Sequence, residues 1–137
     1  MTIRPFGPED IEEVRALWAR CEGLGDGPGD DPAAIGLFLA RNPGCSPVAV
    51  DEGAIVGAAL CGHDGRRGFL YRVGVDPACR RRGIARALAA HGFEALRAQG
   101  IHRAMLFILS DNTDAQAFWR SVGGRERTTL GLWSVDL

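Results

Sequence analysis

A strand-like run, a basic turn and a helix-like run follow one another near the middle of the chain. The run 69–76 is strand-like, the run 84–98 is helix-like, and Arg80-Arg81-Arg82-Gly83-Ile84-Ala85 joins them. The first backbone N–H groups of a helix have no partner inside the helix, and the helix dipole adds partial positive charge there. Gly83 removes the side chain where a ligand would approach closely. The arrangement predicts a site for a phosphate or pyrophosphate.

The glycine pattern separates this turn from two common nucleotide-binding loops. No Gly-Lys-Ser/Thr follows, and the spacing is not Gly-x-Gly-x-x-Gly. The residues fit Arg/Gln-x-x-Gly-x-Gly/Ala through Arg80, Gly83 and Ala85. The alternative interpretation is a solvated arginine cluster that only caps a helix. The preceding strand, the break at Pro77 and the following helix favour the anion site.

Length and composition limit the class of protein. The 137 residues predict one domain, 1–137, and the apolar fraction of 46% and charged fraction of 24% are globular values. A net charge of −1 argues against a nucleic-acid partner. All 16 basic residues are arginine, so the chain has no lysine side chain to acylate in itself.

The four cysteines and the chain start indicate a cytoplasmic protein. No Cys-x-x-Cys pair occurs, which predicts free thiols in a reducing compartment and no zinc or redox motif. We expect no bound metal. The first residues lack a signal-peptide apolar core, and no apolar run approaches the roughly 18 residues of a membrane span. We therefore expect no membrane partner.

Apolar periodicity and turn residues predict the order of elements. The spacing of Ile11, Val14, Leu17, Trp18 and Cys21 predicts a helix with one apolar face. The expected elements are a strand at 2–6, helices from Pro8 and at 32–41, three antiparallel strands at 46–51, 54–61 and 69–76, a helix at 84–98, a strand at 103–109, a helix at 111–122, and one or two final strands within 125–137.

This order, together with the basic turn after Val-Asp-Pro, resembles the GNAT superfamily of N-acetyltransferases along essentially the whole chain. The resemblance implies an α/β (α+β) fold. Its mixed, mostly antiparallel sheet has six to seven strands and a central parallel strand pair. About four helices flank the sheet.

The resemblance also implies residues that bind acetyl-CoA as co-substrate. The basic turn would hold the pyrophosphate. A bulge at Val73-Gly74-Val75 would free backbone groups for the pantetheine arm. The segment from Asn112 resembles Asn-x-x-Ala-x-x-Phe-Tyr. The residues expected to bind the co-substrate are Val73, Gly74, Val75, Arg80, Arg81, Arg82, Gly83, Ile84, Ala85, Arg86, Asn112, Ala115, Phe118 and Trp119.

The expected chemistry departs from the family pattern at two positions. The family often has a tyrosine near the sulfur as general acid, where this chain has Trp119, whose indole N–H does not titrate usefully. Tyr71 stands where some members have a glutamate base. Its usual pKa of about 10 makes it a poor base, although it can orient water or hold the acceptor, and packing in the sheet is an equal alternative. The backbone N–H of Val75 is expected to stabilise the oxyanion.

An acceptor site is expected at Trp18, Tyr71 and the loop 23–31. Asp26 and Asp30 could attract a cationic amine, while a solvated loop is the alternative. The resemblance implies direct transfer of an acetyl group to a primary amine of a small molecule or peptide. A non-catalytic acyl-CoA sensor and a nucleic-acid module are the rival interpretations. The sequence leaves the acceptor, the acyl length and the oligomeric state open, with a homodimer as one alternative.

Overall fold

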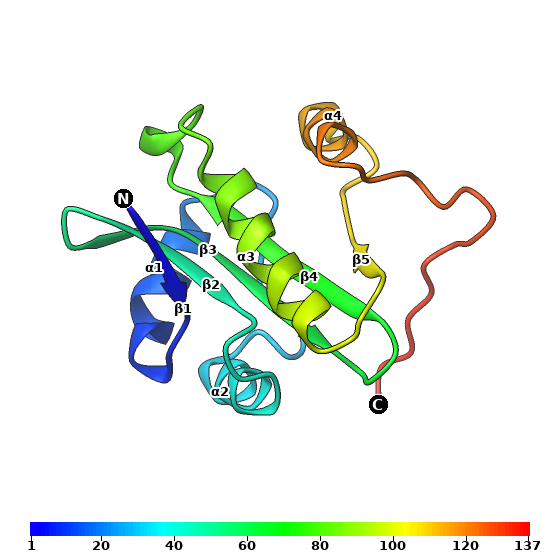
Figure 1. Ribbon diagram of the computed structural model, residues 1–137, viewed down its shortest axis with the longest axis horizontal. Coiled ribbons are helices and arrows are strands. Elements are labelled where there is room, and N and C mark those ends of the chain that lie inside the picture. The colour runs from blue at the N-terminus through cyan, green and yellow to red at the C-terminus, as the bar shows by residue number, and fades with distance from the viewer. The chain divides into compact units, whose positions relative to one another are not determined.

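The computed structural model describes residues 1–137, which divide into two compact units, 1–107 and 108–137 (Figure 1). The first unit holds five strands and three helices. They are β1 (Thr2–Pro5), α1 (Ile11–Ala19), α2 (Pro32–Arg41), β2 (Pro47–Asp51), β3 (Ala54–His63), β4 (Gly68–Val75), α3 (Ile84–Ala98) and β5 (Ala104–Leu106). The second unit holds α4 (Thr113–Ser121).

The strands form one sheet in the order β1-β2-β3-β4-β5. The pairs from β1 to β4 are antiparallel, while β4 and β5 are parallel with Gly68 opposite Ala104 and Leu70 opposite Leu106. The mixed, mostly antiparallel sheet and the four helices confirm the predicted class. The expected six to seven strands are wrong, because the sheet has five. The parallel pair therefore lies at the edge of the sheet instead of its centre.

Helices cover both faces of the sheet in the first unit (Figure 1). Successive strand residues point to opposite faces. Val48 thus packs with Val14 and Leu17 of α1, while its neighbour Ala49 packs with Leu88 of α3. Val14 and Leu17 are completely buried, which confirms the apolar face predicted for α1, although the helix ends at Ala19, before Cys21. Leu88 of α3 is also completely buried.

The central part of β4 is irregular. Tyr71 lies opposite Leu60 and Gly74 lies opposite Ala58, so the two residues Arg72 and Val73 face only one residue of β3. Such a bulge bends the strand and leaves one residue outside the ladder. Arg72 takes a left-handed backbone conformation with a φ of 53°. The expected bulge is present, but it lies at Arg72–Val73, before the glycine.

Gly74 has a different role from the one its sequence context suggests. A Cβ at this position would lie 2.8 Å from Cδ1 of Trp18, 2.9 Å from Cδ1 of Leu24 and 3.2 Å from Sγ of Cys21. Gly74 therefore lets α1 and the following loop approach β4 closely.

The second unit contains α4 and a terminal segment without regular structure. Asn112 caps the helix, since its Oδ1 accepts the N–H of Ala115 at 3.0 Å. The strands expected within 125–137 do not form. Alternating apolar residues give this segment β propensity, but a strand exists only with a hydrogen-bonded neighbour, and Trp133 is 93% exposed. β5 is shorter than expected, since it pairs with β4 only over Gly68–Leu70. No helix in the chain has the length and apolar character needed to span a membrane.

We expect Gly74→Ala to lower the free energy of unfolding by about 1–3 kcal/mol, because the added methyl group overpacks the contact between β4 and α1. Urea denaturation measures this change. Gly25→Ala is the matched control, since a Cβ at Gly25 meets nothing within 4 Å. Equal stability of the two variants would contradict the close-approach role of Gly74.

Candidate functional site

The turn between β4 and α3 has the backbone geometry of an anion site (Figure 1). Arg81 and Gly83 have positive φ values of 63° and 74°. Gly83 is the N-cap of α3, and it has no side chain to satisfy the first N–H groups of that 15-residue helix. A Cβ at Gly83 meets nothing within 4 Å, so the space beside this N-cap residue is open. Unsatisfied N–H groups and the helix dipole both favour an anion here.

The arginines of this turn do not all serve the same purpose. Arg82 binds Asp51 at the end of β2, with 2.9 Å between Nη2 and Oδ2. This hydrogen bond and the carboxylate charge raise the pKa of Arg82 above its usual value. Arg80 and Arg81 are exposed and form no salt bridge. Ile84 is buried under the helix. The charges of Arg80 and Arg81 are therefore not neutralised by a salt bridge.

β4, the strand that leads into the turn, has backbone groups that are not paired within the sheet. The side chains of Val73 and Val75 pack against the cluster beneath α3, which anchors the strand on that face. One residue of the Arg72–Val73 bulge is outside the ladder. On its other edge β4 pairs with β5 only over Gly68–Leu70, so the rest of β4, Val75 included, has no neighbouring strand there. Backbone N–H groups on such an open edge can stabilise a developing oxyanion.

Arg72 holds the loop between α1 and α2, a contact that the sequence did not predict. Its guanidinium lies 4.7 Å from the ring centroid of Trp18. It donates to the carbonyls of Gly25 at 2.9 Å and Leu24 at 3.1 Å, and it pairs with Asp26 at 3.2 Å and Asp30 at 3.1 Å. These partners are more than 40 residues away in the sequence, so no local pattern identifies them.

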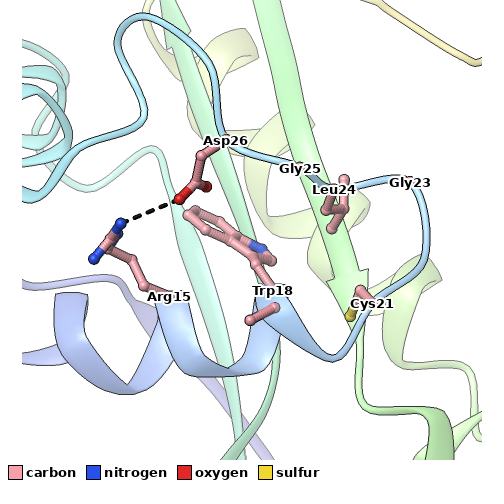
Figure 2. A pocket seen from close by; sticks show the side chains of 8 residues that line it. Arg15, Trp18, Cys21, Gly23, Leu24, Gly25 and Asp26 are labelled. Atoms are coloured by element: carbon pink, nitrogen blue, oxygen red, sulfur yellow. Dashed lines mark hydrogen bonds and ion pairs between the residues drawn. The ribbon is translucent and has the colours of Figure 1, made fainter.

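The loop aspartates are already neutralised by arginines. Asp26 binds Arg15 at 3.2 Å (Figure 2). Asp26 also binds Arg72 at 3.2 Å, and Asp30 binds Arg72. The loop and α1 line an open pocket of about 280 Å³. It is lined by Arg15, Trp18, Ala19, Cys21, Gly23, Leu24, Gly25 and Asp26. Trp18 is 1% exposed and its indole Nε1 has no hydrogen-bond partner. Attraction of a cationic acceptor by Asp26 and Asp30 stays a prediction, and these ion pairs weaken its basis.

Tyr71 precedes the bulge and belongs to an aromatic group. Its ring stacks on those of Phe69 and Phe107, with ring centroids 5.6 Å and 5.5 Å apart. It meets the ring of Phe38 edge-on, with 6.3 Å between centroids. Burial, with a smaller contribution from the charge of Asp64, raises the pKa of the hydroxyl above its usual value. Tyr71 is therefore protonated at neutral pH, where its hydroxyl can donate a hydrogen bond but is a weak base.

The cysteines offer no activated thiol in the core of the first unit. All four are free. Burial and the nearby Cys45 raise the pKa of the Cys61 thiol to about 12, and burial raises the pKa of Cys21. A thiolate is the nucleophilic form of cysteine, so neither residue is suited to form an acyl-enzyme at neutral pH.

The residues expected to bind the co-substrate from α4 lie in the second unit. Asn112 uses Oδ1 to cap the helix, and its carboxamide NH₂ remains a donor group. Trp119 is 8% exposed, and its ring meets that of Phe118 edge-on at 4.9 Å. Ala115 is half-buried.

Comparison with known proteins agrees with this geometry. A family model described as the acetyltransferase (GNAT) family matches residues 11–123. The chain belongs to the GNAT family. The matched region contains the β4 bulge, the basic turn and α4.

Individual relatives agree with the family assignment. An acetyltransferase of Photorhabdus laumondii is 42% identical over 113 residues, which are 82% of this GNAT chain and 78% of the relative. Two solved structures share the fold. An aminoglycoside antibiotic 6'-N-acetyltransferase of Acinetobacter haemolyticus has a TM-score of 0.79 and 19% identity, covering 100% of this chain and 99% of that one. The PaiA N-acetyltransferase of Thermoplasma acidophilum, in complex with coenzyme A, has a TM-score of 0.77 and 14% identity, covering 89% and 87%.

We expect Arg72→Gln to loosen the 24–30 loop, because the neutral amide cannot form the ion pairs to Asp26 and Asp30. Amide hydrogen exchange at Gly27 and Asp30, which are hydrogen-bonded within the loop, should become about tenfold faster or more. Exchange in α3 should not change. Arg20→Gln, which breaks the exposed pair with Asp76, is the control. Unchanged exchange in the loop would contradict this role of Arg72.

Proposed function

We propose that this GNAT acetyltransferase transfers an acetyl group from acetyl-CoA to a primary amine of a small molecule or peptide. The observation that supports this most is the bulge in β4, followed directly by an open helix N-terminus flanked by Arg80 and Arg81. The two parts of this arrangement lie close together in the sequence. The backbone that can hold a thioester and the turn that can hold a pyrophosphate fall within the nine residues 72–80 and the turn after them.

The pyrophosphate fits the turn through its backbone. The N–H groups of Ile84 and Ala85 would donate to phosphate oxygens, and Gly83 leaves the approach open. Arg80 and Arg81 would add charge-assisted hydrogen bonds. Arg82 would contribute mainly by fixing the turn to β2 through Asp51, and Arg86 lies one helical turn further on.

The pantetheine arm would lie along β4. Its amides would pair with the main chain of Val73 and Val75 as an added strand does, past Gly74. Asn112 would donate its carboxamide NH₂ to the arm, and Ala115, Phe118 and Trp119 would complete the site, as the family motif implies.

The transfer itself is direct. The amine nitrogen attacks the thioester carbonyl carbon, and the oxygen charge that develops meets the backbone N–H of Val75. The C–S bond then breaks, the sulfur leaves as a thiolate, and the amine loses a proton as the amide forms. Tyr71 would hold the acceptor or orient the water that takes this proton, because its raised pKa keeps the hydroxyl protonated. That proton, carried by water, can then protonate the thiolate.

A non-catalytic acyl-CoA sensor is the second candidate function. The presence of Trp119 at the tyrosine position favours it, since an indole cannot supply a proton to the thiolate. Turnover separates the two functions: release of free thiol from acetyl-CoA on addition of an amine supports the enzyme, whereas acetyl-CoA binding without turnover supports the sensor.

We expect Gly83→Asp to weaken acetyl-CoA binding by more than about tenfold relative to Gly83→Asn. Asn and Asp have nearly the same size, both tolerate positive φ, and both are favourable N-caps, so both variants should fold. They differ in the negative charge placed where the pyrophosphate would bind. Calorimetric titration with acetyl-CoA measures the affinity. Equal affinity of the two folded variants would place the pyrophosphate elsewhere.

We expect Trp119→Phe to keep kcat within about tenfold of the native value once an acceptor is known, because the indole N–H does not act as a general acid. Trp119→Tyr restores a titratable hydroxyl and should raise kcat. Steady-state kinetics, with circular dichroism as a check on folding, test this. A loss of about a thousandfold in the Phe variant, with acetyl-CoA binding intact, would show that Trp119 takes part in the chemistry.

A further inference from the structure

Four aromatic side chains form a continuous wall on one face of the first unit. This aromatic wall consists of Phe69 and Tyr71 on β4, Phe107 directly after β5, and Phe38 on α2. The rings of Phe69 and Tyr71 are nearly parallel, with 2° between their planes, and those of Tyr71 and Phe107 differ by 19°. Phe38 closes the group with an edge-on contact to Tyr71.

The strand register explains why these rings meet. Phe69 and Tyr71 are two residues apart on β4, so they point to the same face of the sheet. β5 runs parallel to β4 with Met105 opposite Phe69, which brings Phe107 beside Tyr71. The Tyr71 ring packs against the cluster that contains α1 and α2, so the wall is on the side of these helices.

The wall ends at the bulge where the proposed reaction takes place. Tyr71 is followed directly by Arg72 and Val73, the two residues that face a single residue of β3. An amine that reaches a thioester held along this part of β4 from the side of α1 and α2 would pass Tyr71. The aromatic wall is therefore placed to contact whatever group the amine carries.

The wall is open on its outer side. Phe107 is 52% exposed although it is stacked on Tyr71, while Phe38, Phe69 and Tyr71 are half-buried. A further ring or apolar group can pack against the exposed side of Phe107 and continue the stack. Burial of such a group removes apolar surface from water and adds aromatic contacts.

Charge also favours the wall as the surface that meets the acceptor. The carboxylates of Asp26 and Asp30 are paired with Arg72, and Asp26 also with Arg15, so their attraction for a cation is largely cancelled. The faces of aromatic rings carry partial negative charge and attract an ammonium group within about 6 Å. The wall combines this attraction with an apolar surface.

We propose that the acceptor is an amine that carries an aromatic or large apolar group beside its amino nitrogen, and that Phe107, Tyr71, Phe69 and Phe38 recognise this group. The inference rests on the proposed acetyl transfer. Phe107 contacts the acceptor but not acetyl-CoA, and through this contact it determines acceptor specificity. Small polar amines lack the group that the wall binds and are poor acceptors.

The test compares 2-phenylethylamine with ethanolamine as acceptors, with free thiol release as the readout. The native chain should acetylate 2-phenylethylamine with a kcat/KM higher by about tenfold or more, the equivalent of about 1.4 kcal/mol. Phe107→Ala should remove most of this preference, chiefly through KM, and leave the KM for acetyl-CoA unchanged. Leu37→Ala is the matched control, because Leu37 is 73% exposed on α2 and lies outside the wall. It should keep the preference.

Calorimetric titration of 2-phenylethylamine into the protein saturated with CoA separates this inference from the proposed function. Binding by the native chain and by Leu37→Ala, but not by Phe107→Ala, supports the wall even if no amine turns over, in which case acetyl transfer alone fails. Equal kcat/KM for the two amines overturns the inference, as does an equal loss in both variants or the absence of binding.

Discussion

One extra residue in β4 determines the geometry on which the rest of the site depends. A regular strand would place Tyr71 and Arg72 on opposite faces. With the bulge at Arg72–Val73, both side chains pack on the side of α1, while Val73 and Val75 face α3. The same strand therefore supplies an aromatic ring, a guanidinium and a freed backbone group within three residues. Gly74 then allows Trp18 to pack directly against the strand.

The positive φ of Arg72 has a structural cost that its contacts offset. A non-glycine residue with positive φ is unusual, and it persists only where its surroundings require it. Here the guanidinium lies over Trp18 and binds two backbone carbonyls and two carboxylates of the 24–30 loop. The bulge and the ordered loop thus stabilise each other. The ion pairs also leave the 24–30 loop with little net charge.

Other arginines near the site differ in whether the tertiary structure brings a carboxylate next to them. Arg82 is tied to Asp51 and Arg20 to Asp76, whereas Arg80 and Arg81 form no salt bridge beside the N-terminus of α3. Because the unsatisfied helix N–H groups and two exposed guanidinium groups belong to one turn, the turn is suited to a diphosphate. The aromatic wall, by contrast, is apolar. The two ends of the proposed site therefore favour different ligand groups. The turn favours a polyanion, and the surface beside the bulge favours an apolar amine.

Local signals were sufficient for the helices and for the basic turn. The bounds of α2 and α3 agree with those predicted, because Pro32, Gly83 and the apolar spacing act within a few residues of where they stand. The motif around Gly83 likewise predicted an open helix N-terminus. The bulge was expected, but at Gly74. The sequence alone does not distinguish a strand glycine that allows a bulge from one that allows a close contact.

Tertiary structure decided the rest. The final strands expected within 125–137 do not form, since strand propensity has no effect without a neighbour to pair with. Arg72 could not be identified as the residue that holds the loop, because its partners at 24–30 are brought near only by the packing of α1 on β4. Phe38 and Phe107 meet Tyr71 for the same kind of reason, through helix packing and strand register. The sequence by itself determined the turn at Gly83 and the helix that follows it, since all the groups required for them lie within one segment. Only the tertiary structure assembled the aromatic wall, whose members lie up to 69 residues apart.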